Sequence, residues 1–129
     1  MEMLKVLVVE PEKKPYTKEI THDLASLQKE VGGYIQAVYP WDDPCAIICD
    51  EEGKLKGYPY NRVLRDEDGD IYDVIAGTFL VVGLGQEDFV SLTDEYIEKY
   101  GKLFAAPELF IKTNDRLFVI ATEEVGDEF

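Results

Sequence analysis

The sequence has few of the residues that build most metal and nucleophilic sites, since its 129 residues include one histidine and two cysteines. A structural zinc site needs about four Cys or His ligands. No local signature pairs His22 with a cysteine as base and nucleophile, and the pair Gly83 and Gly85 lacks the third glycine of a phosphate-binding loop. We therefore predict no metal, no cofactor and no catalytic residue. An enzyme built on carboxylates or tyrosines is the alternative that remains open.

Basic residues are scarce as well. The chain has 13 Lys and Arg against 27 Asp and Glu, a net charge of −14. Such a surface repels phosphates, which argues against direct binding to nucleic acid or to an anionic membrane. The same charge suits a basic partner protein or mimicry of a polyanion.

Long apolar runs are absent too. No stretch approaches the roughly 20 apolar residues of a membrane span. The first ten residues lack the basic region and the cleavage site of a signal peptide. We therefore expect a cytoplasmic protein without a membrane anchor.

The two cysteines, Cys45 and Cys49, stand four residues apart in an apolar run. On one strand they would lie about 13 Å apart, which is too far for a disulfide. We expect two buried free thiols.

Hydrophobic residues make up 46% of the chain, enough for one core. Short apolar runs bounded by Gly, Pro and acidic turns predict strands, and 3.6-residue spacing predicts two helices. We predict an α+β single domain over 1–122, with an acidic tail at 123–129. Its mostly antiparallel sheet would have five or six short strands, with two helices packed on one face. The strand candidates lie at 3–9, 16–20, 34–39, 45–49, 54–58, 78–82 and 117–121. One helix is expected at 22–31, and a second helix starts at 91–94 and continues its apolar face from Tyr96 to Leu103.

The segment 66–73 alternates acids as a calcium loop does. Ile71 stands where such a loop needs its sixth-position glycine, and Gly77 stands where it needs its closing glutamate. The pattern predicts a solvated hairpin tip.

A basic island occupies 54–65, with four cations and no acid, while the rest of the chain has nine cations against 27 acids. These cations either pair with neighbouring carboxylates or form a selective anion site. In the second case Arg62 would be the main phosphate clamp, because a guanidinium binds phosphate with two parallel hydrogen bonds. Tyr58 and Tyr60 would stack on a base, and Asn61 would hydrogen-bond to its edge. Arg65 and Lys56 would add positive charge, and Gly32 and Gly33 would donate backbone N–H groups.

Several motifs resemble a small family of uncharacterised proteins from Firmicutes, their phages and other mobile elements. They lie at 31–40, which begins Val-Gly-Gly-Tyr-Ile, at 50–55, 59–62 and 88–93, and at 73–79, which ends Gly-Thr-Phe. The resemblance covers 3–105. It implies no activity, but it implies a setting in which small acidic proteins serve as counter-defence or host-takeover factors in the host cytoplasm.

Two functions follow from these observations. The first is a non-enzymatic protein that binds a small anionic, nucleotide-like ligand through the island. The alternative is an acidic protein–protein inhibitor or DNA mimic that acts on a basic, nucleic-acid-handling host protein. Edge strands of a small sheet make a homodimer possible in either case.

Overall fold

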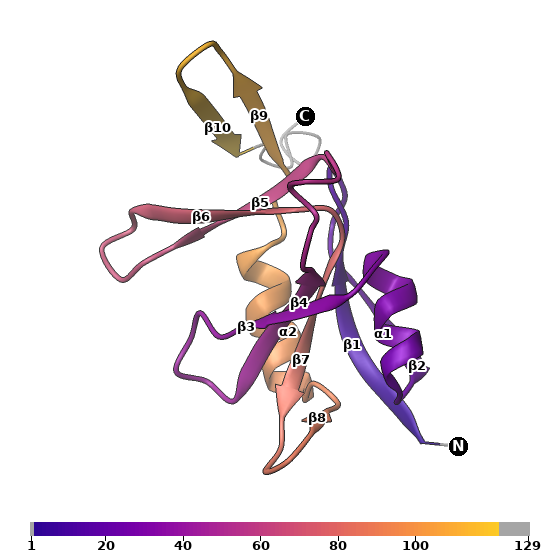
Figure 1. The fold of residues 1–129 in the computed structure, drawn as a ribbon. Helices are drawn as coiled ribbons and strands as arrows, with labels where there is room; N and C mark the ends of the chain where they lie inside the picture. Colours follow the sequence, from indigo (N-terminus) through magenta and orange to yellow (C-terminus); the bar gives the residue numbers. More distant parts are fainter. Residues whose placement is uncertain (1, 122–129) are drawn as a thin grey trace.

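The computed structural model describes residues 2–121, which form strands and two helices (Figure 1). The predicted tail at 123–129 lies outside the described residues. The chain order is β1 (Met3–Val9), β2 (Tyr16–Thr21), α1 (Leu24–Val31), β3 (Ile35–Val38), β4 (Cys45–Asp50), β5 (Tyr60–Arg65), β6 (Ile71–Ala76), β7 (Phe79–Leu84), β8 (Phe89–Val90), α2 (Asp94–Leu103), β9 (Glu108–Lys112) and β10 (Leu117–Ala121).

Six of these strands form one antiparallel sheet in the order β2-β1-β7-β4-β3, with β8 added beside β7. The α+β class and the antiparallel sheet are thus confirmed. The remaining strands form two separate hairpins, β5–β6 and β9–β10.

The predicted placement of both helices on one face is wrong. Leu4, Val6 and Val8 of β1 pack with α1, whereas Leu7 and Val9 face the core that holds α2. Strands β4 and β7 repeat this alternation, so both faces of the sheet are apolar and both need a cover. Helix α1 covers one face, and α2 together with hairpin β5–β6 covers the other.

Helix α1 is shorter at its start than the predicted 22–31. Asp23, rather than the expected neighbour Thr21, caps it by accepting a hydrogen bond from the Ser26 N–H at 2.7 Å. Gly32 ends it with a φ of +95°, as the sequence predicts.

The strand expected at 54–58 is absent, because 51–57 forms consecutive turns. The Lys56 and Tyr58 N–H groups donate to the Glu52 and Gly53 carbonyls within this segment, so they are unavailable to a sheet. Both edges of β4 are occupied, one by β3 and the other by β7, so neither is left for the expected return strand. Within 2–121, no helix is long and apolar enough to cross a membrane.

Candidate functional site

Arg62, the predicted phosphate clamp, lies inside the protein with 1% of its surface exposed. Its Nε and Nη2 donate to the Phe104 carbonyl, and Nη2 also donates to the Lys13 carbonyl at 2.7 Å. Its Nη1 donates to the backbone carbonyl and to Oδ1 of Asn61. A guanidinium has five N–H donors, and these five bonds match that number. Burial lowers the pKa of Arg62, and the nearby Glu108 carboxylate partly offsets this effect.

Asn61 is fully buried beside it. Its Nδ2 donates to the carbonyls of Val9 and Gly77 at 2.8 and 2.9 Å, and its Oδ1 accepts from Arg62. The prediction that Arg62 and Asn61 contact a ligand is therefore corrected: they bind hairpin β5–β6 to β1 and to the end of α2. Their side-chain N–H groups donate to backbone carbonyls that would otherwise be buried without partners.

Four other candidates do come together, at the end of α1, around a carboxylate that the sequence did not single out. Lys56 Nζ lies 2.8 Å from Oδ2 of Asp50, whose side chain is 1% exposed. Tyr58 donates its hydroxyl to the Gly32 carbonyl at 3.3 Å. A Cβ on Gly33 would lie 2.7 Å from Asp50 Oδ2, so a side chain at this position would displace the Lys56–Asp50 pair.

Charge is balanced within this cluster. Burial would raise the pKa of the Asp50 carboxyl, but hydrogen bonds from Lys56 and from the Glu52 N–H outweigh burial and lower it. The Lys56 charge is thus neutralised by the fold itself, as the ion-pair interpretation of the island predicts.

The last two candidates lie apart from this cluster. Tyr60 packs edge-on against Phe110 of β9, with the ring centres 5.6 Å apart. Arg65 stands at the exposed end of β5 and donates to the Gly69 carbonyl at 2.9 Å. The basic island therefore does not converge on one anion site.

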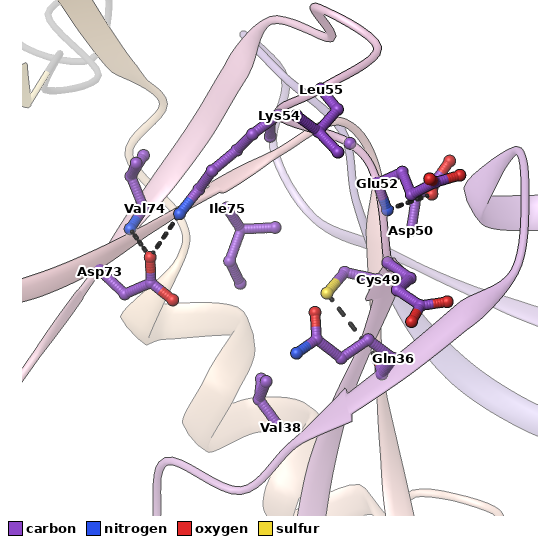
Figure 2. Close-up of a pocket in the computed structure, with 13 residues that line it drawn as sticks. Gln36, Val38, Cys49, Asp50, Glu52, Lys54, Leu55, Asp73, Val74 and Ile75 are labelled. Atoms are coloured by element: carbon purple, nitrogen blue, oxygen red, sulfur yellow. Dashed lines mark hydrogen bonds and ion pairs between the residues drawn. The ribbon is translucent and has the colours of Figure 1, made fainter.

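A cavity of about 410 Å³ lies beside Cys49, between the edge strand β3, its neighbour β4, the turns at 51–55 and β6 (Figure 2). An ion pair between Lys54 and Asp73, 2.7 Å long, stands at its rim. The Cys49 thiol donates a long hydrogen bond to the Gln36 carbonyl. Burial, with Asp73 and Asp50, raises the pKa of Cys49 to about 11, so the thiol stays protonated and is a poor nucleophile.

A second hollow, of about 760 Å³, opens between the loop 39–43, the tip of hairpin β5–β6 and α2. Three aromatic residues line it. Tyr39 and Tyr72 are 61% and 54% exposed, and Trp41 is half-buried and stacked on Tyr100 with ring centres 4.0 Å apart. We call it the acidic–aromatic hollow, and its lining is Tyr39, Pro40, Trp41, Asp42, Asp43, Arg65, Asp66, Glu67, Tyr72 and Lys99.

Four carboxylates and two cations line this hollow, an excess of two negative charges. Asp43 is already engaged, because it pairs with Lys99 and accepts the Tyr100 hydroxyl at 2.6 Å. Lys99 and Tyr100 together lower the pKa of Asp43. Asp66 accepts the N–H groups of Asp68 and Asp70.

Asp42 and Glu67 differ from these acids. Both are exposed, and neither has a hydrogen-bond or ion-pair partner among residues 2–121. Two free carboxylates beside exposed aromatic faces suit a lysine or arginine side chain, which gains a salt bridge and a cation–π contact. Sequence reasoning missed this site. The signal was the one tryptophan, which is followed directly by two acids in a proline-bounded loop.

The hollow continues into an apolar groove of about 660 Å³ between β5 and α2, whose walls include Leu64, Leu103 and Phe104. Trp41 and Arg65 line both spaces. A bound segment with an apolar residue beside its cation would find a place for each.

The hairpin tip at 66–70 is exposed, as predicted, and brings ligand atoms of Asp66, Asp68 and Asp70 within 4.8 Å of one another. Exposed acids of this kind are common without an ion, and Asp66 already accepts two backbone hydrogen bonds. The cluster does not by itself define a metal site.

The model of a family described as a domain of unknown function, DUF3846, matches residues 3–105. No curated protein and no solved structure matches the chain. The matched region contains the sheet, both helices and the acidic–aromatic hollow, and it ends before β9.

Proposed function

The chain belongs to the DUF3846 family, and from this premise we propose that it is a non-catalytic binding protein that holds a basic segment of another protein. The observation that carries the proposal is the acidic–aromatic hollow, where Asp42 and Glu67 lack partners within the described chain. The excess of 14 negative charges attracts a basic partner over a distance, and the hollow supplies the short-range contact.

The partner class follows from the charge and from the resemblance. A basic surface that normally binds nucleic acid is complementary to this chain, so the protein would compete with the nucleic acid for it. The resemblance to proteins of Firmicutes, their phages and other mobile elements implies a setting in which the role would be counter-defence in the host cytoplasm. The target would then be a host nucleic-acid-handling protein.

A small anionic ligand is less well supported. Arg62 and Asn61 are buried with their hydrogen-bonding groups engaged, and Lys56 pairs with Asp50. Tyr60 and Arg65 face different hollows. No group of free cations remains from the basic island to hold a phosphate.

Trp41 provides the test, because it is the only tryptophan and lines the hollow. An arginine-rich peptide with interspersed leucines is titrated into the protein, with a peptide in which glutamine replaces arginine as the neutral control. We expect the arginine peptide, but not the glutamine control, to change Trp41 fluorescence, and we expect this response to weaken in high salt. Absence of saturable binding by the arginine peptide would overturn the proposal.

Matched charge variants locate the binding. Asp42→Asn with Glu67→Gln removes the two free carboxylates of the hollow. Glu19→Gln with Glu51→Gln removes the same charge from two exposed positions elsewhere. We expect about tenfold weaker binding from the first pair, which corresponds to about 1.4 kcal/mol, and a small effect from the second. Equal weakening by both pairs would show diffuse attraction, as in a DNA mimic, and would overturn the hollow as the site.

A further inference from the structure

Strand β3 forms one edge of the main sheet, because among residues 2–121 it pairs only with β4 (Figure 1). Directly before β3, the Glu51 N–H donates to the Tyr34 carbonyl at 2.8 Å. The backbone groups of an antiparallel pair point alternately toward and away from the partner strand. The N–H and carbonyl groups of Ile35 and Ala37 therefore point away from β4, along the free edge of the sheet.

This edge lacks the features with which proteins usually prevent further strand pairing, namely charged residues, proline or a bulge. Strand β3 reads Ile-Gln-Ala-Val, and its register with β4 is continuous. Strand β2, at the other end of the sheet order, has Lys18 and Glu19 among its exposed residues. Of these two edges, β3 is therefore the one that is open to another strand.

Strand β3 also leads from one hollowed space to another. Gln36 and Val38 line the cavity beside Cys49 (Figure 2), and the next residue, Tyr39, lines the acidic–aromatic hollow. Paired residues of neighbouring strands point to the same face of a sheet, so a strand added beside β3 places every second side chain on the side of Gln36 and Val38. The cavity wall includes Val38, Cys49 and Ile75, which suits an apolar side chain, and the hollow suits a cation.

Charge indicates which chain the added strand belongs to. The hollow at the end of β3 has two more carboxylates than cations, and Asp42 and Glu67 lack partners within the described chain. A second copy of this protein would bring another net charge of −14, and residues 122–129 contain four acids and no base. Both of these occupants are repelled, whereas a basic segment of another protein is attracted.

We propose that the basic segment of the partner binds in an extended conformation, as an additional strand paired with β3. Main-chain hydrogen bonds to Ile35 and Ala37 supply affinity, and the cavity and the hollow each take a side chain of the segment. The inference rests on the proposed function and specifies the conformation of the bound segment. Its apolar residue and its cation are separated by an even number of positions, because only every second side chain faces the two spaces.

Amide hydrogen exchange of the full chain, measured by NMR with and without the arginine-rich peptide, tests the pairing. We expect exchange of the Ile35 and Ala37 N–H groups to slow by about tenfold or more at saturation. The Thr17 and Glu19 N–H groups point away from β1 on the other edge and should keep their rates. A peptide that binds, as Trp41 fluorescence shows, without slowing exchange at Ile35 and Ala37 would overturn the pairing and leave the proposed function standing. A peptide that does not bind overturns both.

Matched proline variants locate the edge. Ala37→Pro removes an outward N–H group from β3, and Thr17→Pro removes one from β2. Proline is tolerated on an edge strand where the missing N–H would face solvent, so we expect wild-type circular dichroism from both variants. The arginine-rich peptide should bind Ala37→Pro about tenfold more weakly than the wild type and Thr17→Pro with unchanged affinity. Equal affinity for the two folded variants would overturn the pairing, and the exchange measurement decides the question if Ala37→Pro does not fold.

Discussion

Arg62 shows how one side chain can organise a junction between elements. Its guanidinium holds carbonyl oxygens from Asn61, Phe104 and Lys13, which come from three separate parts of the chain. Arginine suits this task because its five donors lie in one plane and its charge is less strongly hydrated than an ammonium group. Neutral oxygens can therefore satisfy it inside the protein.

We predict that Arg62→Ala lowers the free energy of unfolding by about 3–5 kcal/mol, because several buried acceptors lose their donor together. Arg62→Lys would cost about 2 kcal/mol or more, since an ammonium has three donors instead of five. Urea unfolding measures both. Arg65→Ala is the control, an exposed arginine on the same strand, with an expected change within about 0.5 kcal/mol. A loss for Arg62→Ala no larger than that of this control would contradict the structural role.

The two thiols give a second prediction at this scale. Burial, with the Asp43 charge, raises the pKa of Cys45 to about 11, and Cys49 has a similar value. At pH 8 only about one thiol in a thousand is then ionised, so a disulfide reagent should label the native protein on the order of a hundredfold more slowly than the urea-unfolded chain. The rate should rise with pH up to about 11. Rapid labelling of native protein at pH 8 would contradict this.

At the scale of elements, Gly77 leaves room for the Tyr58 ring. A Cβ on Gly77 would lie 2.6 Å from the Tyr58 ring, and Gly77 has a φ of +84°. Gly57 has a similar φ of +75°, with nothing within 4 Å of its Cβ position. The two glycines therefore share the backbone requirement and differ in the contact.

We predict that Gly57→Ala lowers the free energy of unfolding by about 1 kcal/mol through backbone strain alone. Gly77→Ala should cost about 3 kcal/mol, because the new methyl also displaces the Tyr58 ring. Urea unfolding compares the two. In a Tyr58→Ala background the cost of Gly77→Ala should fall to that of Gly57→Ala. If both alanines cost the same in the wild-type background, Tyr58 does not constrain Gly77.

The elements that the sequence predicts correctly are those with a local pattern. Strand β1 is rich in Val and Leu, helix α1 has an apolar stripe at helical spacing, and Gly32 ends α1 as expected. The failures concern tertiary arrangement. Apart from Lys5, both alternating sets of side chains in β1 are apolar. The prediction nevertheless placed both helices on one face, because periodicity alone does not say which helix covers which face. Strand β9 was missed because its three apolar residues, Leu109, Phe110 and Ile111, are consecutive and show no alternation.

The anion site predicted from the basic island differs from the structure for a related reason. A run of cations in the sequence shows charge but not exposure, and burial converts Arg62 and Asn61 from ligand contacts into structural groups. Lys56 lies in the consecutive turns where a strand was predicted, and this local fold brings it to Asp50, six residues earlier at the end of β4. The hollow combines the loop 39–43 with a hairpin tip more than twenty residues later, and no local pattern connects the two.

At the scale of the whole molecule, the net charge of −14 and the free edge of β3 contribute to peptide binding in different ways. Attraction between the acidic protein and a basic peptide weakens as salt screens it. Hydrogen bonds between the neutral main-chain groups of β3 and of the peptide involve no net charge, so salt does not screen them in this way. The Debye length falls from about 10 Å at 0.1 M salt to about 3 Å at 1 M, which covers the range in which the attraction changes.

We therefore predict that raising salt over this range weakens binding of the arginine-rich peptide to the wild type at least tenfold. Ala37→Pro should keep its loss of about tenfold relative to the wild type at every salt concentration, because that loss comes from the backbone. The loss caused by Asp42→Asn with Glu67→Gln should shrink as salt rises, because it comes from charge. Trp41 fluorescence measures all three affinities. If the loss for Ala37→Pro disappears in high salt together with that of the charge variant, the proline acts through the charges of the hollow. Main-chain pairing does not depend on salt in that way, so that result would leave the hollow as a site for a side chain alone, without an added strand.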